Sequence, residues 1–215
     1  MKNEVIKEIE KNKIIAIMRG VEPSVAVRVA EALYEGGIKL VEITFNQKDK
    51  NSFVDTVNAI KAVKRAMTGK MCVGAGTVIT EEQLELAYQA GAEYIISPDT
   101  DENIIHKTIE KGMVSIPGAY TGTEIKKAHN AGADFVKIFP CPSASYIKAL
   151  KAPLSHIKFL AVGGVGANNA KEFMQAGATG IGVGGLLVNK EWVNAGAFDK
   201  ITETAKILVE GLKRT

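Results

Sequence analysis

Lys137 is the residue whose position in this sequence most directly suggests chemistry. It lies in the apolar run 135–140 (FVKIFP), which ends at a proline. Such a run is typical of a strand buried on both faces, as in a parallel sheet covered by helices. A buried ammonium must be paired, deprotonated or exposed, and a deprotonated lysine can attack a carbonyl to form a Schiff base. A lysine that reaches solvent from a strand edge is the structural alternative.

Glu42 interrupts a second apolar run, 40–45 (LVEITF), in the same way. Opposite charges on two buried strands suggest one shared site, in which the carboxylate moves protons for the chemistry at Lys137. A structural ion pair is the alternative, because buried pairs occur without a function and need not stabilise a fold.

Both residues belong to a repeat in which short apolar strands alternate with amphipathic helices along the whole chain. The predicted strands are 14–19, 40–45, 72–77, 94–98, 115–119, 135–140, 158–164 and 180–185, and the predicted helices are 23–35, 51–67, 81–90, 102–111, 122–131, 144–151, 167–176 and 198–213.

The ends of these helices carry their own signals. Thr80 with Gln83, and Thr121 with Glu124, have the spacing of capping boxes and predict two helix starts. A glycine in the left-handed conformation commonly closes a helix. Such glycines precede five predicted strands, at Gly36-Gly37, Gly91, Gly112, Gly132 and Gly177.

Eight strand-and-helix units predict parallel strands joined by helical crossovers. We therefore expect an α/β fold, a compact (β/α)₈ TIM barrel with an additional N-terminal helix, in which residues 1–215 form one domain. An open doubly wound sheet is the competing architecture. The glycine cluster 177–185 matches a dinucleotide fingerprint poorly, because too little chain follows it to complete a binding half.

The composition excludes several classes of partner. The chain has 215 residues, of which 46% are hydrophobic and 24% charged, as in a soluble globular protein. Its 27 Lys and Arg are spread among 24 Asp and Glu, so we expect no nucleic acid and no membrane as a partner. Segment 1–13 is charged and amphipathic and lacks the apolar region of a signal peptide, which predicts a cytoplasmic location.

The cysteines and histidines predict neither a disulfide nor a metal site. Cys72 and Cys141 are far apart, which fits a reducing cytosol. His106, His129 and His156 lie in different segments without ligand spacing.

In a barrel of this kind, active sites lie at the C-terminal ends of the strands. Glycine pairs at two such ends would let backbone N–H groups approach a phosphate, although tight turns and close helix packing explain glycines equally well. The residues at or near the strand ends are Arg19, Asn46, Thr77, Pro98, Pro117, Lys137, Gly163 with Gly164, and Gly184 with Gly185.

An imine-forming lysine, a proton-transferring carboxylate and a phosphate cradle fit carbon–carbon bond cleavage in a phosphorylated keto compound. The lysine attacks the ketone, and the protonated imine withdraws electrons. The bond two carbons away then breaks and leaves an enamine.

Six motifs, in order from about residue 5 to residue 190, resemble the KDPG/KHG aldolase family (2-dehydro-3-deoxy-phosphogluconate aldolase and 4-hydroxy-2-oxoglutarate aldolase). The combination of the glutamate strand, the GAGT strand and the KIFP strand is specific, although none of them would be alone. The motifs are 41–44 (VEIT), 74–77 (GAGT), 96–98 (ISP), 116–118 (IPG), 136–140 (VKIFP) and 162–165 (VGGV).

The resemblance implies a homotrimeric class I aldolase of the TIM-barrel type that needs no metal and no cofactor. It would cleave 2-keto-3-deoxy-6-phosphogluconate to pyruvate and glyceraldehyde 3-phosphate. By this resemblance Lys137 is the Schiff-base lysine and Glu42 the general acid and base, working through a water. The other implied site residues are Arg19 at the substrate carboxylate, Thr77 near pyruvate, Pro98, Pro117, Thr121 and Phe139 along the pocket, and Gly163, Gly164, Gly184 and Gly185 at the phosphate.

Three positions depart from the common pattern of KDPG aldolases. Asn46 replaces an arginine, Val162 a threonine and Gly185 a serine. Asn46 and Val162 are closer to the phosphogalactonate branch of the family. Val162 lacks a hydroxyl that could bond to the C4 hydroxyl of the substrate, where the gluconate and galactonate substrates differ. Gly185 would leave the phosphate to backbone donors.

Other functions stay open on the sequence alone. Within enzymes they are a phosphogalactonate aldolase, a broader 4-hydroxy-2-oxoglutarate or pyruvate aldolase, and a phosphate-binding isomerase or epimerase without a lysine imine. From another class, the chain could be a trimeric phosphosugar-binding or scaffold protein that has lost catalysis. Lys137 and Glu42 argue against that last alternative, because each would be costly in a purely structural barrel.

Overall fold

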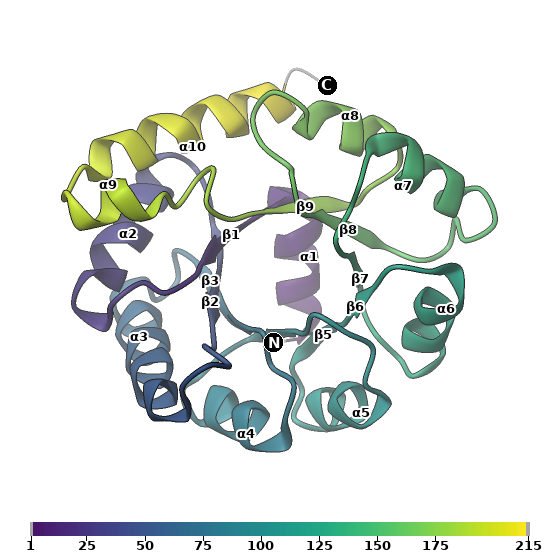
Figure 1. Cartoon of the computed structure of the whole chain (residues 1–215), viewed down its shortest axis with the longest axis horizontal. Coiled ribbons are helices and arrows are strands. Elements are labelled where there is room, and N and C mark those ends of the chain that lie inside the picture. Colours follow the sequence, from purple (N-terminus) through teal and green to yellow (C-terminus); the bar gives the residue numbers. More distant parts are fainter. Residues whose placement is uncertain (1, 214–215) are drawn as a thin grey trace.

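Parallel strands form a nearly closed barrel inside a ring of helices in the computed structural model, which describes residues 2–213 (Figure 1). The order of the strands is β5-β4-β3-β2-β1-β9-β8-β7-β6, and all observed pairings are parallel. The prediction of a (β/α)₈ barrel is confirmed, and the open sheet is excluded. The strands are β1 (Ile14–Met18), β2 (Leu40–Thr44), β3 (Cys72–Gly76), β4 (Tyr94–Ile96), β5 (Val114–Ile116), β6 (Gly118–Ala119), β7 (Val136–Ile138), β8 (Phe159–Val162) and β9 (Gly180–Val183).

The fifth predicted strand is divided into β5 and β6 by Pro117. Proline has no backbone N–H and therefore cannot donate to a strand ladder. The two halves stand at opposite ends of the strand order, so this single stretch closes the barrel. The Pro117 carbonyl still takes part, because it accepts a hydrogen bond of 2.9 Å from the Lys137 N–H.

Helices follow the strands on the outside of the barrel. All eight predicted helices are present, and the five predicted closing positions each contain a glycine with φ between 72° and 103°. The helices are α1 (Lys2–Asn12), α2 (Pro23–Glu35), the short 3₁₀ helix η1 (Lys50–Ser52), α3 (Phe53–Ala66), α4 (Glu81–Gln89), α5 (Glu102–Glu110), α6 (Gly122–Asn130), α7 (Ala144–Lys151), α8 (Ala170–Gln175), α9 (Lys190–Asn194) and α10 (Phe198–Lys213).

Two local predictions need correction. The Thr121–Glu124 capping box is present, but the Gln83 side chain accepts from the Ile79 N–H instead of from Thr80. Helix α8 begins at residue 170 rather than 167, because Asn169 folds back on the preceding loop: its Oδ1 accepts from the Gly166 N–H.

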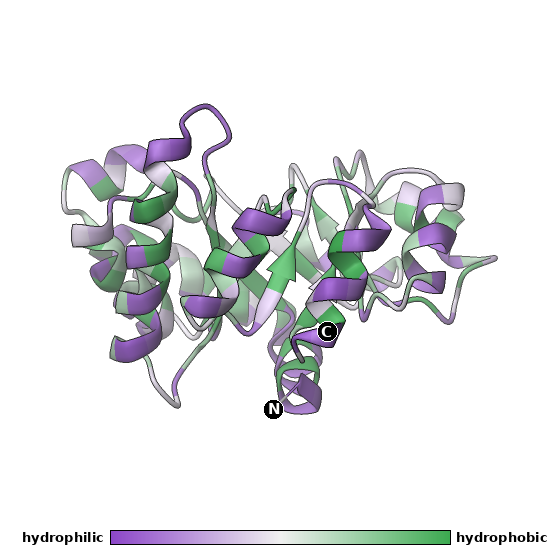
Figure 2. Ribbon diagram, turned by 90° about the horizontal axis from the view of Figure 1, so that it is seen from below, coloured by the Kyte–Doolittle hydropathy of each residue, from purple (hydrophilic) through white to green (hydrophobic). Residues whose placement is uncertain are grey.

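Apolar side chains divide into two sets by the alternation of each strand. One set packs between strands and outer helices. The other fills the lower interior of the barrel, where Leu40 and Phe135 meet Val5 and Ile9 of α1. Helix α1 thus closes the N-terminal end of the strands, and Figure 2 shows it projecting beyond the barrel. Glu42 and Lys137 lie two residues beyond Leu40 and Phe135, and side chains at this spacing point to the same face of a strand. They therefore also point into the barrel, in the next layer toward the C-terminal ends of the strands, which form the mouth of the barrel.

None of the helices within residues 2–213 combines the length and apolar character needed to cross a bilayer.

Candidate active site

Lys137 lies in the middle of β7 and its side chain reaches a cavity of about 370 Å³ at the mouth of the barrel. Only 6% of the residue surface is exposed. Its Nζ stands 4.5 Å from the centroid of the Phe139 ring, which also lines this cavity, so the amine lies against an aromatic side chain. The lysine does not reach solvent from a strand edge, and that structural alternative is wrong.

Glu42 projects from β2, on the other side of the barrel from β7 (Figure 1), and is 2% exposed. The glycines of the GAGT strand make room for it. A Cβ at Gly76 would collide with the Glu42 carboxylate, and one at Gly74 would collide with the Tyr94 ring. The Tyr94 hydroxyl donates to the Val41 carbonyl at 2.6 Å, which fixes the layer beneath Glu42. These glycines are therefore required by the space that the site needs.

Burial shifts the two ionisable groups in opposite directions. It raises the pKa of the Glu42 carboxyl, against the attraction of Lys137 and, more weakly, Arg19. It lowers the pKa of the Lys137 amine; Glu42 opposes this shift, and the Arg19 cation adds to it. Both changes favour the neutral forms, a free amine nucleophile beside a carboxyl that can donate a proton.

Neither group is committed to a protein partner. Among residues 2–213 every fully enclosed side-chain polar atom has a hydrogen-bond partner. The Glu42 carboxylate and Lys137 amine make no hydrogen bond and no direct ion pair within that part of the chain, so their polar atoms must keep access to the cavity. A structural ion pair would instead join the two side chains directly.

Arg19 follows β1 and links the Lys137 cavity to an outer cavity of about 620 Å³, since it lines both. Thr77 and Asn46 line the outer cavity. Thr77 has a positive φ of 56°, which is unfavourable for a residue branched at Cβ. Its carbonyl accepts from Gln47 Nε2 at 2.7 Å, and Gln47 Oε1 accepts from the fully buried Gln83 at 2.8 Å. This chain of amides holds Thr77 in its conformation.

The glycine pairs and Val162 line the Lys137 cavity, as expected from their strand ends. Gly163 and Gly164 have φ of 109° and 67°, conformations that favour glycine. The Gly164 carbonyl accepts from Asn169, and the Gly184 carbonyl accepts from the N–H groups of residues 187 and 188. Within the described chain the N–H groups of Gly164 and Gly185 donate to no acceptor, so both are available to an anion.

Three predicted pocket residues line neither of these cavities. Pro98 follows β4, and its carbonyl is packed where a Cβ at position 118 would lie. Pro117 supplies the backbone acceptor for Lys137. Thr121 is exposed as the N-cap of α6, where its hydroxyl accepts from the Glu124 N–H.

The sequence did not point to Lys190 or Gln47, and it indicated Gln83 only as part of a capping box. Lys190 begins α9 and lines both cavities together with Arg19. Its helix was predictable in principle, because Asn189 followed by Glu191 is a common helix start. The pairing of Gln47 with Gln83 joins residues 36 positions apart and carries no sequence signal.

A metal ion has no evident protein site in residues 2–213, where no three His, Cys, Asp or Glu side chains come together.

We expect Gly76→Ala to disable the site while the barrel still folds. The new methyl group must displace the Glu42 carboxylate, so kcat should fall about 100-fold or more, the usual effect of losing a general acid or base. Activity assays and thermal melts check this. Gly122→Ala is the matched control, because an added Cβ there meets nothing within 4 Å. Normal turnover in Gly76→Ala would show that the position of Glu42 is unimportant.

Comparisons with known proteins agree with this geometry. The family model described as KDPG and KHG aldolase matches residues 5–204. The 2-dehydro-3-deoxy-6-phosphogalactonate aldolase of Escherichia coli is 36% identical over 87% of this chain and 93% of its own length. The KHG/KDPG aldolase of E. coli is 32% identical over 87% and 86%.

A solved structure described as native KDPGal superposes with a TM-score of 0.84 at 33% identity, covering 94% of each chain. Family model, relatives and fold agree over most of the chain. The chain belongs to the KDPG/KHG aldolase family and is an enzyme of the lyase class.

Proposed function

We propose that the protein is a class I aldolase that cleaves 2-keto-3-deoxy-6-phosphogluconate to pyruvate and glyceraldehyde 3-phosphate. The observation that carries the proposal is the buried Lys137 amine, which makes no ion pair within residues 2–213 and is open to a cavity that the glycine pairs also line. Burial favours its unprotonated form, which is the nucleophile that imine formation needs.

In the first half of the reaction Lys137 Nζ attacks the C2 ketone and forms a carbinolamine. Glu42, in its acid form, protonates the hydroxyl that leaves as water, and the protonated imine results. Burial, which raises the Glu42 pKa, makes the acid form available for this step.

In the second half the Glu42 carboxylate takes the proton of the C4 hydroxyl. The C3–C4 bond breaks, its electron pair moves into the enamine, and glyceraldehyde 3-phosphate leaves. Protonation of the enamine at C3 and hydrolysis of the imine release pyruvate and the free lysine. Arg19 provides a guanidinium for the substrate carboxylate, and the glycine N–H groups cradle the phosphate.

A second candidate substrate is 2-keto-3-deoxy-6-phosphogalactonate. Val162 favours it, because this aliphatic side chain stands on the wall of the Lys137 cavity where a threonine could discriminate at C4. The relative named phosphogalactonate aldolase is also somewhat more similar than the KHG/KDPG aldolase from the same organism. The homotrimer implied by the family resemblance and the cytoplasmic location expected from segment 1–13 stay predictions.

The test is to incubate the protein with pyruvate, reduce it with borohydride and map the adduct by mass spectrometry. A reduced pyruvate adduct on Lys137 supports the proposal, whereas no adduct on any lysine contradicts it. Comparing kcat/KM for the two C4 epimers then decides the substrate.

A further inference from the structure

We propose that Lys190 is a phosphate-binding residue of this enzyme and makes its site selective for phosphorylated substrates. The inference rests on the proposed function and adds to it a side chain that none of the family motifs contains. Lys190 lies five residues beyond Gly185, on the short connection between β9 and α10.

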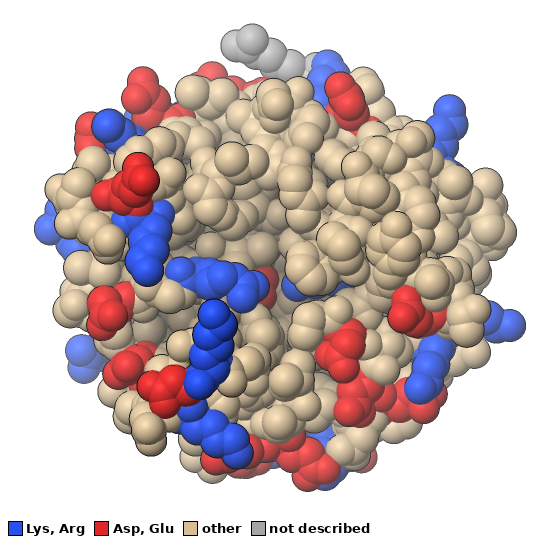
Figure 3. Space-filling model, in the orientation of Figure 1, with Lys and Arg blue, Asp and Glu red and all other residues tan. Residues whose placement is uncertain are grey.

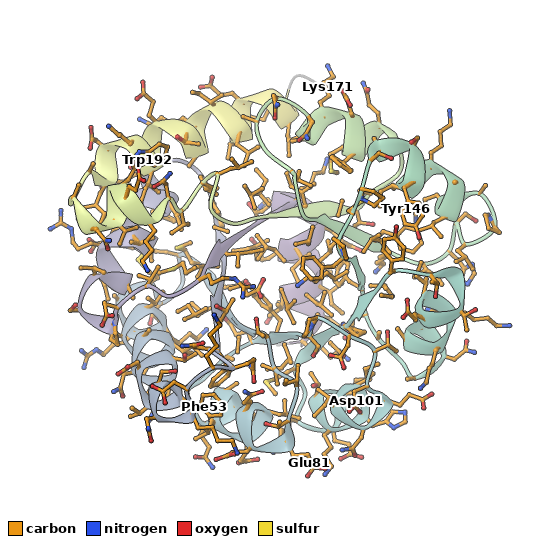
Figure 4. All side chains as sticks on the ribbon, viewed as in Figure 1. Phe53, Glu81, Asp101, Tyr146, Lys171 and Trp192 are labelled. Carbon is orange, nitrogen blue, oxygen red and sulfur yellow. The ribbon has the colours of Figure 1, made fainter. Side chains whose placement is uncertain are left out.

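The position of Lys190 at the mouth is well defined. Leu187 and Val188, just before it, are buried, and Asn189 caps α9 by accepting from two N–H groups of that helix. Trp192, labelled in Figure 4 on the outer ring of helices, and Val193 pack against the outer apolar core. The backbone that carries Lys190 is therefore held in place, although its side chain is exposed.

Lys190 stands where three cavities meet. Besides the Lys137 cavity and the outer cavity, it lines a third cavity of about 380 Å³, and Arg19 is the one other residue within 2–213 that lines all three. An ammonium at this junction faces the same space as the glycine pairs 163–164 and 184–185. A phosphate held by the free N–H groups of Gly164 and Gly185 would lie in the cavity that Lys190 borders.

The charge of Lys190 is not neutralised. Among residues 2–213 it makes no ion pair, although Glu22 lines two of the same cavities. Figure 3 shows basic side chains gathered along one side of the central hollow, and those lining the outer cavity are Arg19, Lys48 and Lys190. Two of these three cations are less suited to the phosphate than Lys190. Arg19 is close enough to Glu42 and Lys137 to shift their pKa values, which places it nearer the reacting end of the substrate. Lys48 does not line the Lys137 cavity, where the glycine pairs lie.

Gly185 gives the chemical reason for such a residue. Without a side chain, this loop offers a phosphate only backbone donors, which hold an anion but leave most of its charge uncompensated. A lysine adds a charge-assisted hydrogen bond and a full positive charge. The ligand class is therefore a phosphate monoester, here the phosphate at the aldehyde end of the substrate.

The first test compares Lys190→Met with the matched control Lys206→Met, which removes an exposed lysine on α10 that lines none of the three cavities. We expect Lys190→Met to raise KM for the phosphorylated substrate about 10-fold or more, the usual effect of one charge-assisted hydrogen bond. KM for non-phosphorylated 4-hydroxy-2-oxoglutarate and the trapping of pyruvate on Lys137 should not change. Lys190→Arg should restore most of the loss.

The second test is independent of catalysis. Calorimetry with inorganic phosphate should show about 10-fold weaker binding to Lys190→Met than to the wild type or to Lys206→Met. Equal phosphate affinity in all three, or a loss in Lys48→Met instead, would overturn the assignment. Failure of pyruvate trapping in the wild type would refute the aldolase proposal while leaving this phosphate measurement valid.

Discussion

Lys137→Met is expected to abolish turnover and to remove the pyruvate adduct that borohydride traps, while the protein remains folded. Among the described residues that line the Lys137 cavity, Lys190 is the other primary amine, and its side chain is exposed, whereas Lys137 is buried. Methionine has a similar length and replaces a buried polar amine beside Phe139 by an apolar thioether, so the melting temperature should be unchanged or higher. Steady-state assays, mass spectrometry and thermal melts measure the three effects.

Lys151 offers a matched control for the trapping experiment. Its pKa is also lowered by burial, and its Nζ lies 4.9 Å from the centroid of the Phe159 ring. It differs in donating to two backbone carbonyls and in lining none of the three mouth cavities. Lys151→Met should therefore keep the adduct on Lys137. An adduct that moves to Lys151, or persists in Lys137→Met, would show that reactivity follows the pKa alone and not the cavity.

The barrel and its two central residues were predictable because the physics that places them is local. A parallel strand buried on both faces must be apolar throughout, so one charge in such a run is conspicuous. Lys137 and Glu42 each interrupt one. Helix-closing glycines follow one another at steps of 21 and 20 residues from Gly91 to Gly132, and this repeated strand-and-helix unit predicts parallel strands.

The parts that the sequence did not predict depend on contacts between distant segments. Gly76 is explained by the Glu42 side chain that occupies its space, and the role of Gln83 in the site by its hydrogen bond to the distant Gln47. The position of Lys190 depends on how the turn after β9 returns over the mouth, which no periodicity encodes. Thr121 shows both cases: its capping box follows from local spacing and is present, whereas the place along the pocket that the resemblance implies for it stays a prediction.

Glu42→Gln is expected to slow turnover about 100-fold or more, because glutamine keeps the size of the side chain but cannot exchange a proton. Glu42 has no hydrogen-bond partner within residues 2–213 that would be left unpaired, so the fold should be retained. Near-normal turnover in this variant would remove Glu42 from the role of general acid and base.

The same variant makes a second, sharper prediction for the pH dependence of imine formation. The Glu42 charge opposes the lowering of the Lys137 pKa, so its loss must let that pKa fall further. Imine formation with pyruvate rises as Lys137 loses its proton, and this rise should therefore move to lower pH in Glu42→Gln. Arg19 acts in the opposite direction, so Arg19→Met should move the rise to higher pH. The pH at which imine formation rises can be measured in each variant by trapping single turnovers across the pH range. Shifts in opposite directions in Glu42→Gln and Arg19→Met would show that both charges act directly on the pKa of Lys137. A common shift, or none, would mean that Lys137 is governed by burial alone, and Glu42 would then contribute only its proton.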